Sequence, residues 1–192
     1  MTTLKAEKRS IDVRAKKLRR EGFVTGNLFG REIESSIPLK MSAREIESLL
    51  KTNRKGSQIL LVVEGTTYHV LIKDVQYNSM KHCVDEIDFQ ALVSGQKVHS
   101  VAEIMLQNHE KVSTGVLEEL LKEISYKALP EDLVDRVIVD VGDMRVGDTI
   151  RVKDLAIAGN NKIEVLTDLD EAVVTVAAVK NQIPEEETET EE

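Results

Sequence analysis

The apolar residues of this chain occur in short runs, each long enough for a β-strand and too short for a typical helix. The longest runs are Ile59–Val63 and Ala172–Val179, and Thr175 interrupts the second. Residues that favour turns lie between such runs, as at Gly142-Asp143 and Gly147-Asp148. Aromatic residues make up only 3% of the 192 residues, so the core must consist of Val, Ile and Leu. These features predict a mainly β protein with a few short helices.

The first half of the chain contains the clearest local signals. Gln58–Val63 and Thr67–Asp74 are rich in Val, Ile and Thr and flank a turn at Glu64-Gly65-Thr66, which predicts a β-hairpin. Asp12–Glu21 is polar and basic, and it predicts a loop or a short helix. Further strands are expected at Leu4–Arg9, Val24–Phe29, Ile33–Leu39 (ending at Pro38) and Cys83–Phe89.

One helix is predicted with a defined start, at Ala43–Lys51. Ser42 precedes it as a favourable N-cap residue, and Glu45 completes a capping box. Ile46 and Leu49 fall on one face of this segment. The sequence therefore predicts a short amphipathic helix.

A turn-forming seam at Ser94-Gly95-Gln96 divides the chain into two expected domains, residues 1–92 and residues 93–181. Val116–Ile124 is ambiguous, because its leucines match a helical period while its short length also fits a strand. Residues 182–192 contain the run EEETETEE, which cannot be buried and predicts a disordered acidic tail. Strands of the second half are expected at Lys97–Leu106, Arg136–Val141, Thr149–Val152, Ile163–Leu166 and Val173–Val179.

Positive charge is concentrated at the amino-terminal end, although the whole chain has a net charge of −8. Residues 1–31 hold nine Lys/Arg against three Asp/Glu, whereas the other 161 residues hold 17 against 31. A basic segment on an acidic body indicates a polyanion bound at one end of the molecule, with Lys and Arg contacting phosphates. A solvated loop that keeps the protein soluble explains the charge equally well. Five of the cations lie close together: Arg14, Lys16, Lys17, Arg19 and Arg20.

Signatures of catalysis are absent from the sequence. It contains no P-loop, no dinucleotide-binding glycine pattern, no zinc-protease motif and no serine-hydrolase elbow. His82 and Cys83 are neighbours, and neighbouring side chains in a strand point to opposite faces, so a reactive pair is not expected. The carboxylates of Asp85, Glu86 and Asp88 are too few on one face for a divalent cation. We therefore expect no enzyme, cofactor, metal or small-molecule substrate.

Features of secreted and membrane proteins are also missing. The single cysteine, Cys83, excludes an internal disulfide and fits a reducing compartment. The amino-terminal residues include several charges and no apolar segment typical of a secretory signal. No run approaches the roughly 18 apolar residues that span a bilayer. We expect a cytoplasmic protein without membrane contact.

Several short motifs occur in a consistent order between residues 4 and 180. In the first half they are Ala6-Glu7 with Arg9, Lys16–Gly22, Phe29-Gly30, Ile72–Gln76 and Ile87–Phe89. In the second half they are Leu129-Pro130, Ile138–Val141, and Gly147–Ile150 followed by Val152, Asp154 and Leu155. With these motifs the chain resembles the bacterial large-subunit ribosomal protein L-twenty-five, in the longer two-domain form called the general stress protein Ctc family.

The resemblance implies an amino-terminal β-barrel of six or seven strands that binds 5S ribosomal RNA at its loop E region. It implies a second, mostly β domain that packs against neighbouring large-subunit ribosomal proteins, and it implies no catalysis. It also favours extended structure for Val116–Ile124. The four cations that it assigns to RNA would contact phosphates or groove edges, and the polar side chains would hydrogen-bond base or sugar groups. The implied RNA-binding residues are Arg9, Lys16, Arg19, Phe29, Lys73, Gln76 and Asp88.

The sequence departs from the family pattern at positions expected to face RNA. Ser10–Arg14, which includes Asp12, lacks the glycines of the family's usual turn, and Thr25-Gly26 replaces a Pro-Ala pair. Phe29 keeps the ring of the family's usual Tyr and loses its hydroxyl. Glu86 replaces a His, so a donor is lost and negative charge is added.

Two functions are consistent with these observations. The first is a structural protein of the large ribosomal subunit that binds 5S ribosomal RNA through its basic amino-terminal domain. The second is a divergent paralogue with weakened RNA binding, acting off the ribosome as a stress-associated, protein-binding module. The order of the motifs favours the first, whereas Glu86, the missing glycines and the acidic tail favour the second.

Overall fold

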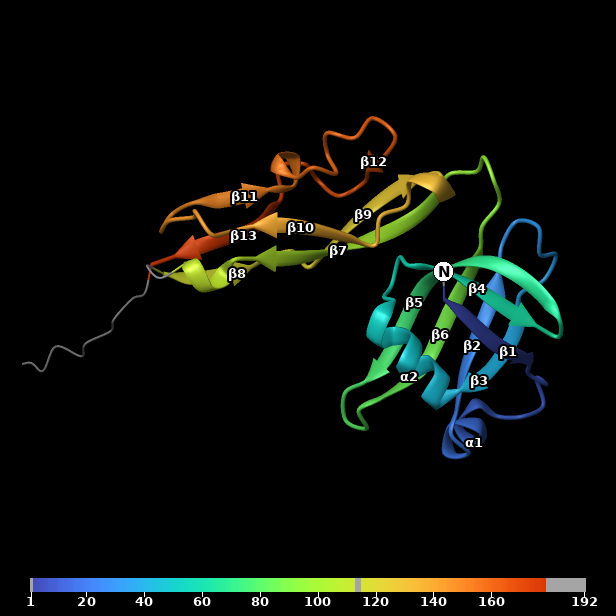
Figure 1. Cartoon of the computed structure of the whole chain (residues 1–192). Coiled ribbons are helices and arrows are strands. Elements are labelled where there is room, and N and C mark those ends of the chain that lie inside the picture. The colour runs from blue at the N-terminus through green and yellow to red at the C-terminus, as the bar shows by residue number, and fades with distance from the viewer. Residues whose placement is uncertain (1, 113–114, 179–192) are drawn as a thin grey trace, which may run out of the picture.

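The computed structural model describes residues 2–112 and 115–178, which form two β-rich parts joined by the connection between β6 and β7 (Figure 1). The first part also contains two helices. Its elements are β1 (Thr3–Lys8), α1 (Ala15–Arg20), β2 (Phe23–Phe29), β3 (Ile37–Ser42), α2 (Ala43–Thr52), β4 (Gln58–Val63), β5 (Thr66–Asn78) and β6 (Cys83–Ala91). The strands of the second part are β7 (Val98–Gln107), β8 (Val116–Glu119), β9 (Glu123–Ala128), β10 (Arg136–Asp140), β11 (Thr149–Arg151), β12 (Glu164–Val165) and β13 (Ala172–Ala177).

The first part is a closed barrel with the strand order β1-β3-β2-β6-β5-β4. Parallel pairing of β1 with β4 closes it, with Leu4 opposite Leu61. The predicted hairpin joins β4 and β5 through Glu64 and Gly65, which both have positive φ, at 49° and 87°. Such a two-residue turn matches the right-handed twist of the paired strands. The predicted barrel is therefore confirmed, with six strands.

Alternating side chains of the strands fill the barrel. In β4 the buried residues are Ile59, Leu61 and Val63, and the residues between them are half-buried. The apolar face of α2 adds Ile46 and Leu49 to the same core. This aliphatic packing was expected from the scarcity of aromatic residues.

Two local predictions need correction. The strand expected at Ile33–Leu39 begins only at Ile37, because residues 31–35 form a turn and bend after β2. It continues through Pro38, whose carbonyl accepts the Arg9 N–H at 2.8 Å. Ser42 is the N-cap residue of α2, but its side chain makes no capping hydrogen bond. Ser42 is also the last residue of β3, and its backbone keeps the extended conformation of that strand.

The second part contains a four-stranded sheet, β10-β7-β9-β12, and a three-stranded sheet, β11-β13-β8. Their buried side chains share one core, which includes Ile124, Tyr126 and Val173. The segment 116–124 is extended, as the resemblance implied: β8 pairs with β13, and the amides that follow bond to the Val173 carbonyl. Tertiary pairing therefore overrides the helical spacing of its leucines. The predicted acidic tail lies outside the described residues.

The two parts meet where the segment between α2 and β4 contacts the second part. Gly56 has a φ of +87°, and a Cβ there would lie 2.1 Å from the Val101 carbonyl oxygen, so only glycine fits. Ser57 Oγ lies 3.2 Å from an Asp135 carboxylate oxygen, and Gln58 Nε2 donates to the Pro130 carbonyl at 2.8 Å. These hydrogen bonds join residues that are 72 to 78 positions apart.

Candidate nucleic-acid interface

Polar side chains line the outside of the barrel along β2, β6 and β5, which pair in that order. Residues between them, such as Leu28 and Phe89, point inward and are buried. The register forms two rows across the three strands, and together we call these rows the outer face. The first row is Thr25, Glu86 and Gln76, and the second is Asn27, Asp88 and Asp74.

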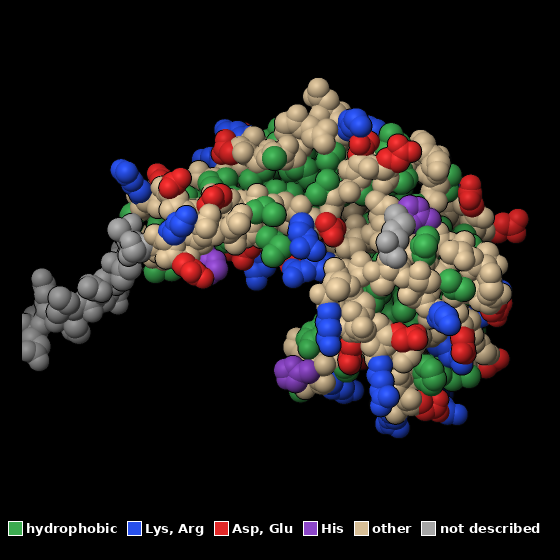
Figure 2. Space-filling model, viewed as in Figure 1, with side chains coloured by type: hydrophobic (Ala, Val, Ile, Leu, Met, Phe, Trp, Pro, Cys, Tyr) green, Lys and Arg blue, Asp and Glu red, His purple; other side chains and the backbone are tan. Residues whose placement is uncertain are grey.

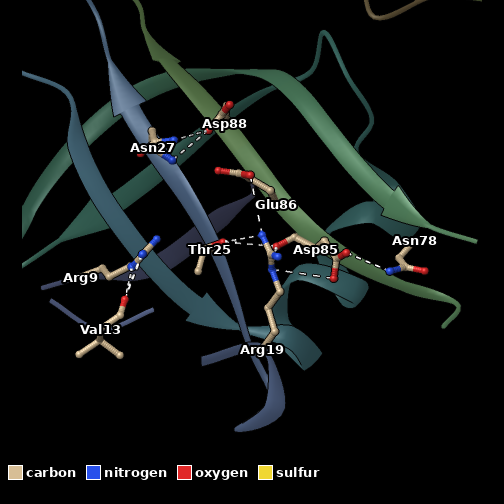
Figure 3. Close-up of polar contacts among 9 residues, drawn as sticks. All are labelled: Arg9, Val13, Arg19, Thr25, Asn27, Asn78, Asp85, Glu86 and Asp88. Carbon is tan, nitrogen blue, oxygen red and sulfur yellow. Dashed lines mark hydrogen bonds and ion pairs between the residues drawn. The ribbon is translucent and has the colours of Figure 1, made fainter. Parts of the chain in front are cut away.

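Arg19 reaches the outer face from α1, whose only buried residue is Leu18 (Figure 3). A register shift between β5 and β6 leaves Asp85 opposite no residue of β5. The Asp85 carbonyl accepts the Arg19 Nε–H at 3.0 Å, and the guanidinium also donates to Thr25 Oγ1 at 3.4 Å. Carboxylate oxygens of Asp85 and Glu86 lie 3.9 and 3.8 Å away. The side chain is held in place and keeps 32% of its surface exposed.

The second row of the outer face has its own hydrogen bonds. One Asp88 carboxylate oxygen accepts from the Asn27 backbone N–H at 3.0 Å and from Asn27 Nδ2 at 3.1 Å (Figure 3). Both residues are half-buried. Because the second carboxylate oxygen of Asp88 has no hydrogen bond to the described residues, it is available as an acceptor.

Arg9 organises the loop between β1 and α1. Its Nε and Nη2 donate to the Val13 carbonyl at 3.2 and 3.0 Å (Figure 3). The Val13 N–H in turn bonds to the Ser10 carbonyl at 3.3 Å. Arg9 thus closes this shortened loop, which explains how it forms without the glycines of the family pattern.

The other predicted site residues differ in their exposure and in their position on the barrel. Lys16 is exposed on α1 and Gln76 is exposed on β5, whereas Phe29 is half-buried at the end of β2. Lys73 lies at a second register shift of β5, and its Nζ donates to the His99 carbonyl of the second part at 2.7 Å. The structure therefore brings Arg19, Gln76 and Asp88 together and places Lys73 at the junction. Their contacts with RNA stay a prediction.

The cations of the amino-terminal segment are partly neutralised within the barrel. Arg19 lies between two carboxylates, and Lys17 pairs with Glu21 at 4.0 Å. Arg14, Lys16 and Arg20 are exposed and have no ion pair with the described residues. Figure 2 shows positive and negative side chains intermixed over the visible side of the barrel.

Two departures from the family pattern acquire a physical reason. A Cβ at Gly26 would lie 1.9 Å from the Ile87 carbonyl oxygen, so glycine permits the close pairing of β2 with β6. That pairing carries Glu86 toward Arg19. Glu86 therefore acts as an intramolecular partner of a cation that the resemblance assigns to RNA.

Sequence reasoning placed Thr25 on the RNA-facing side only as a departure from the family pattern, and it missed Asn27 and Asp85 as parts of this site. Asn27 lies inside a strand that the sequence predicted. Because successive residues of a strand point to opposite faces, its position between Gly26 and the inward-facing Leu28 could have indicated that Asn27 faces outward. Asp85 was considered only as part of an acidic run. Its contact with Arg19 spans 66 residues, and no local pattern indicates it.

Two kinds of site are absent from the part of the chain that the structure describes. In residues 2–112 and 115–178, no group of three or more His, Cys, Asp or Glu side chains could hold a metal ion. Over the same residues, no helix has the length and apolar character needed to cross a membrane.

Comparison with known proteins finds relatives along nearly the whole chain. Residues 4–89 match the family model described as Ribosomal L25p family, and residues 97–180 match the one described as Ribosomal protein TL5, C-terminal domain. A protein of Carboxydothermus hydrogenoformans named Large ribosomal subunit protein bL25 is 33% identical, with 96% of this chain and 95% of that protein covered. The protein of the same name from Caldanaerobacter subterraneus is 28% identical, with 98% and 96% covered.

A third relative of that name, from Finegoldia magna, is 31% identical over 91% of this chain and 82% of its own length. These relatives carry the names of ribosomal structural proteins, which agrees with the prediction of a protein without enzymatic activity. Since both β-rich parts match, and a relative above 30% identity is covered almost from end to end, the chain belongs to the Ribosomal L25p family in its two-domain form.

Proposed function

We propose that this protein is a structural constituent of the large ribosomal subunit in the cytoplasm and binds 5S ribosomal RNA through the outer face of its barrel. The observation that carries the proposal is the position of Arg19. Its guanidinium is fixed by the Asp85 carbonyl beside two rows of hydrogen-bonding side chains. The relatives named as large-subunit proteins support the assignment to the ribosome.

The outer face and α1 supply two kinds of contact. The exposed cations Arg14, Lys16 and Arg20 are suited to phosphates, which position an RNA and contribute salt-dependent affinity. Gln76 and the free oxygen of Asp88 are suited to base edges and ribose hydroxyls. Arg19 Nη1 has no partner among the described residues and is available as a donor in a fixed orientation.

A gel-shift titration of full-length protein with 5S ribosomal RNA tests this function. We expect a shift at micromolar protein and none with an unrelated RNA of equal length. The variant K16A/R20A should bind about tenfold more weakly, and its salt slope should fall by about 1.8, since each lost phosphate contact removes about 0.9. The variant R44A/K51A loses the same charge from exposed positions of α2 and serves as the control. If wild-type protein gives no shift at micromolar concentration, the proposal is rejected.

Co-sedimentation distinguishes the off-ribosome alternative, which none of the relatives' names favours. We expect the protein to sediment with large subunits at moderate salt and to be released as salt increases. Recovery only in the soluble fraction at every salt concentration would support the alternative.

A further inference from the structure

A groove at the junction of the two parts concentrates positive charge. Its volume is about 640 Å³, within the range of sites for small ligands. Among the described residues, the lining contains no carboxylate and no Phe, Tyr or Trp ring. Four cations line it, together with His99 and two glutamine side chains: Arg31, Lys73, Lys97 and Lys127.

Elements from both parts bring these cations together. Arg31 lies in the turn between β2 and β3, and Lys73 lies in β5 of the same barrel. Lys97 immediately precedes β7, and Lys127 lies in β9 directly opposite His99. Figure 1 shows the β2–β3 turn beside the β6–β7 connection at the same end of the barrel. Gly30, which begins the turn, lies against Ala91 at the end of β6.

Few negative groups oppose these cations. Lys97 pairs with Glu164 at 3.5 Å, where both side chains are about half exposed. Arg31 and Lys127 have no ion pair with the described residues, and Lys73 Nζ is held by the His99 carbonyl at 2.7 Å. Burial, followed by the nearby Lys55 ammonium, lowers the pKa of Lys73. The groove is thus a region where positive charges are close together and incompletely compensated.

We infer that this groove binds the phosphodiester backbone of an RNA strand that passes between the two parts of the chain. The inference rests on the proposed function and adds a second region of RNA contact to the outer face. Cations without an ion pair gain most affinity from a polyanion, because by neutralising phosphates they release the salt cations that are condensed on the nucleic acid. A backbone is favoured over stacked bases, since a stacking platform uses several aromatic side chains and His99 is the only aromatic residue in the described lining. Glutamine amides at the groove can bond to sugar and phosphate oxygens.

NMR titration of the full-length, ¹⁵N-labelled protein with octauridylate tests the groove directly. We expect saturable shifts of the backbone amides of Arg31, Lys97, His99 and Lys127. In the variant R31A/K127A these shifts should weaken about tenfold in affinity, and the salt slope should fall by about 1.4, at about 0.7 for each single-stranded phosphate contact. The variant R44A/K51A, with the same change in charge on α2, should bind within twofold of wild type. Spectra of both variants without ligand report whether they fold.

Each outcome distinguishes the groove from the proposed function. Saturable groove shifts without a 5S RNA gel shift would reject the proposed function and leave the groove as an RNA-backbone site. A 5S gel shift without saturable groove shifts, or equal octauridylate affinity in folded R31A/K127A, would overturn the groove inference. Octaglutamate that binds the groove as tightly as octauridylate would also overturn it, because an acidic peptide would then be the better ligand.

Discussion

The outer face and the junction groove both contain arginine and lysine, but they differ in what lies opposite those cations. On the outer face, Arg19 lies within 4 Å of carboxylate oxygens from Asp85 and Glu86. In the groove, Arg31 and Lys127 have no ion pair with the described residues, although Glu164, which pairs with Lys97, lies opposite Lys127 on the neighbouring strand. Residues of the same type therefore produce different local fields, according to what the fold brings near them.

This difference indicates two distinct contributions to RNA binding. A neutralised arginine adds little to long-range attraction, but its fixed N–H groups can select a partner by geometry. Unopposed lysines and arginines attract any polyanion, and this attraction decreases steeply with salt. We expect the outer face to contribute most of the specificity and the groove to contribute salt-sensitive affinity.

Disrupting the pairing of β2 with β6, which forms the outer face, should cause the largest loss of stability. In Gly26→Val, the new side chain would overlap the Ile87 carbonyl, so β2 and β6 could no longer pair closely. We expect the free energy of unfolding to fall by more than about 3 kcal/mol, measured by urea denaturation. Gly159→Ala is the control, because its Cβ would lie 3.8 Å from the nearest heavy atom. A wild-type midpoint in Gly26→Val would contradict the described pairing.

A looser junction should lower stability moderately and weaken RNA binding at the groove but not at the outer face. Gly56→Ala introduces a Cβ 2.1 Å from the Val101 carbonyl oxygen at a φ of +87°. We expect a loss of about 2 kcal/mol in unfolding free energy and about a tenfold loss in octauridylate affinity. 5S ribosomal RNA should still bind through the barrel. Unchanged octauridylate affinity together with an altered junction would show that the groove does not require both parts.

Arg19 and Arg20 provide a matched pair on one helix. Arg19→Ala removes a hydrogen bond to the Asp85 carbonyl and takes the nearby cation away from the Asp85 and Glu86 carboxylates, so we expect a loss of about 1–2 kcal/mol in unfolding free energy. Its effect on the salt slope should be below the 0.9 of a free phosphate contact. Arg20→Ala should show the reverse: unchanged stability and a slope reduced by about 0.9. If the two variants show the same stability and the same salt slope, paired and unpaired cations do not contribute differently to RNA binding.

Reducing the negative charge on the outer face should have a smaller, favourable effect. Glu86 lies 3.8 Å from Arg19 Nη2, so its replacement frees the guanidinium for an RNA oxygen. We expect Glu86→His to bind 5S ribosomal RNA about fivefold more tightly, equivalent to about 1 kcal/mol. Glu86→Gln separates removal of charge from addition of a donor. If neither variant changes the affinity in a gel shift, Glu86 does not face RNA.

The smallest expected effect is a change in the titration of Lys73. Its pKa lies below the ordinary value because burial and Lys55 disfavour the ammonium form. Since folding penalises the protonated group, this penalty on stability is fully present below the lowered pKa and disappears as pH rises from that pKa to the ordinary one. Phosphates in the groove should raise the pKa, which NMR titration of the Lys73 side chain with and without octauridylate can measure. A pKa unaffected by octauridylate would place the RNA elsewhere.

Local sequence patterns predicted much of the architecture. The hairpin around Glu64-Gly65 and the helix at residues 43–52 depend on turn chemistry and on periodicity over a few residues, so their signals are local. The start of β3 was misplaced, because alternation near Ile33 was weak and the turn before Ile37 carries no strong marker. The extended form of residues 116–124 depends on pairing with β13, more than 50 residues away, and periodicity alone could not decide it.

The sequence by itself determined the aliphatic β class, the short helix, the two-part organisation of motifs and the excess of cations near the amino terminus. Only the tertiary structure decided which of those cations remain unopposed. Strand register brought Asp85 to Arg19 across 66 residues, and the junction brought Lys127 into one groove with Arg31. The physical reason is that the electrostatic potential at a side chain depends on distances in space. These distances are set by pairing and packing between segments far apart in the chain.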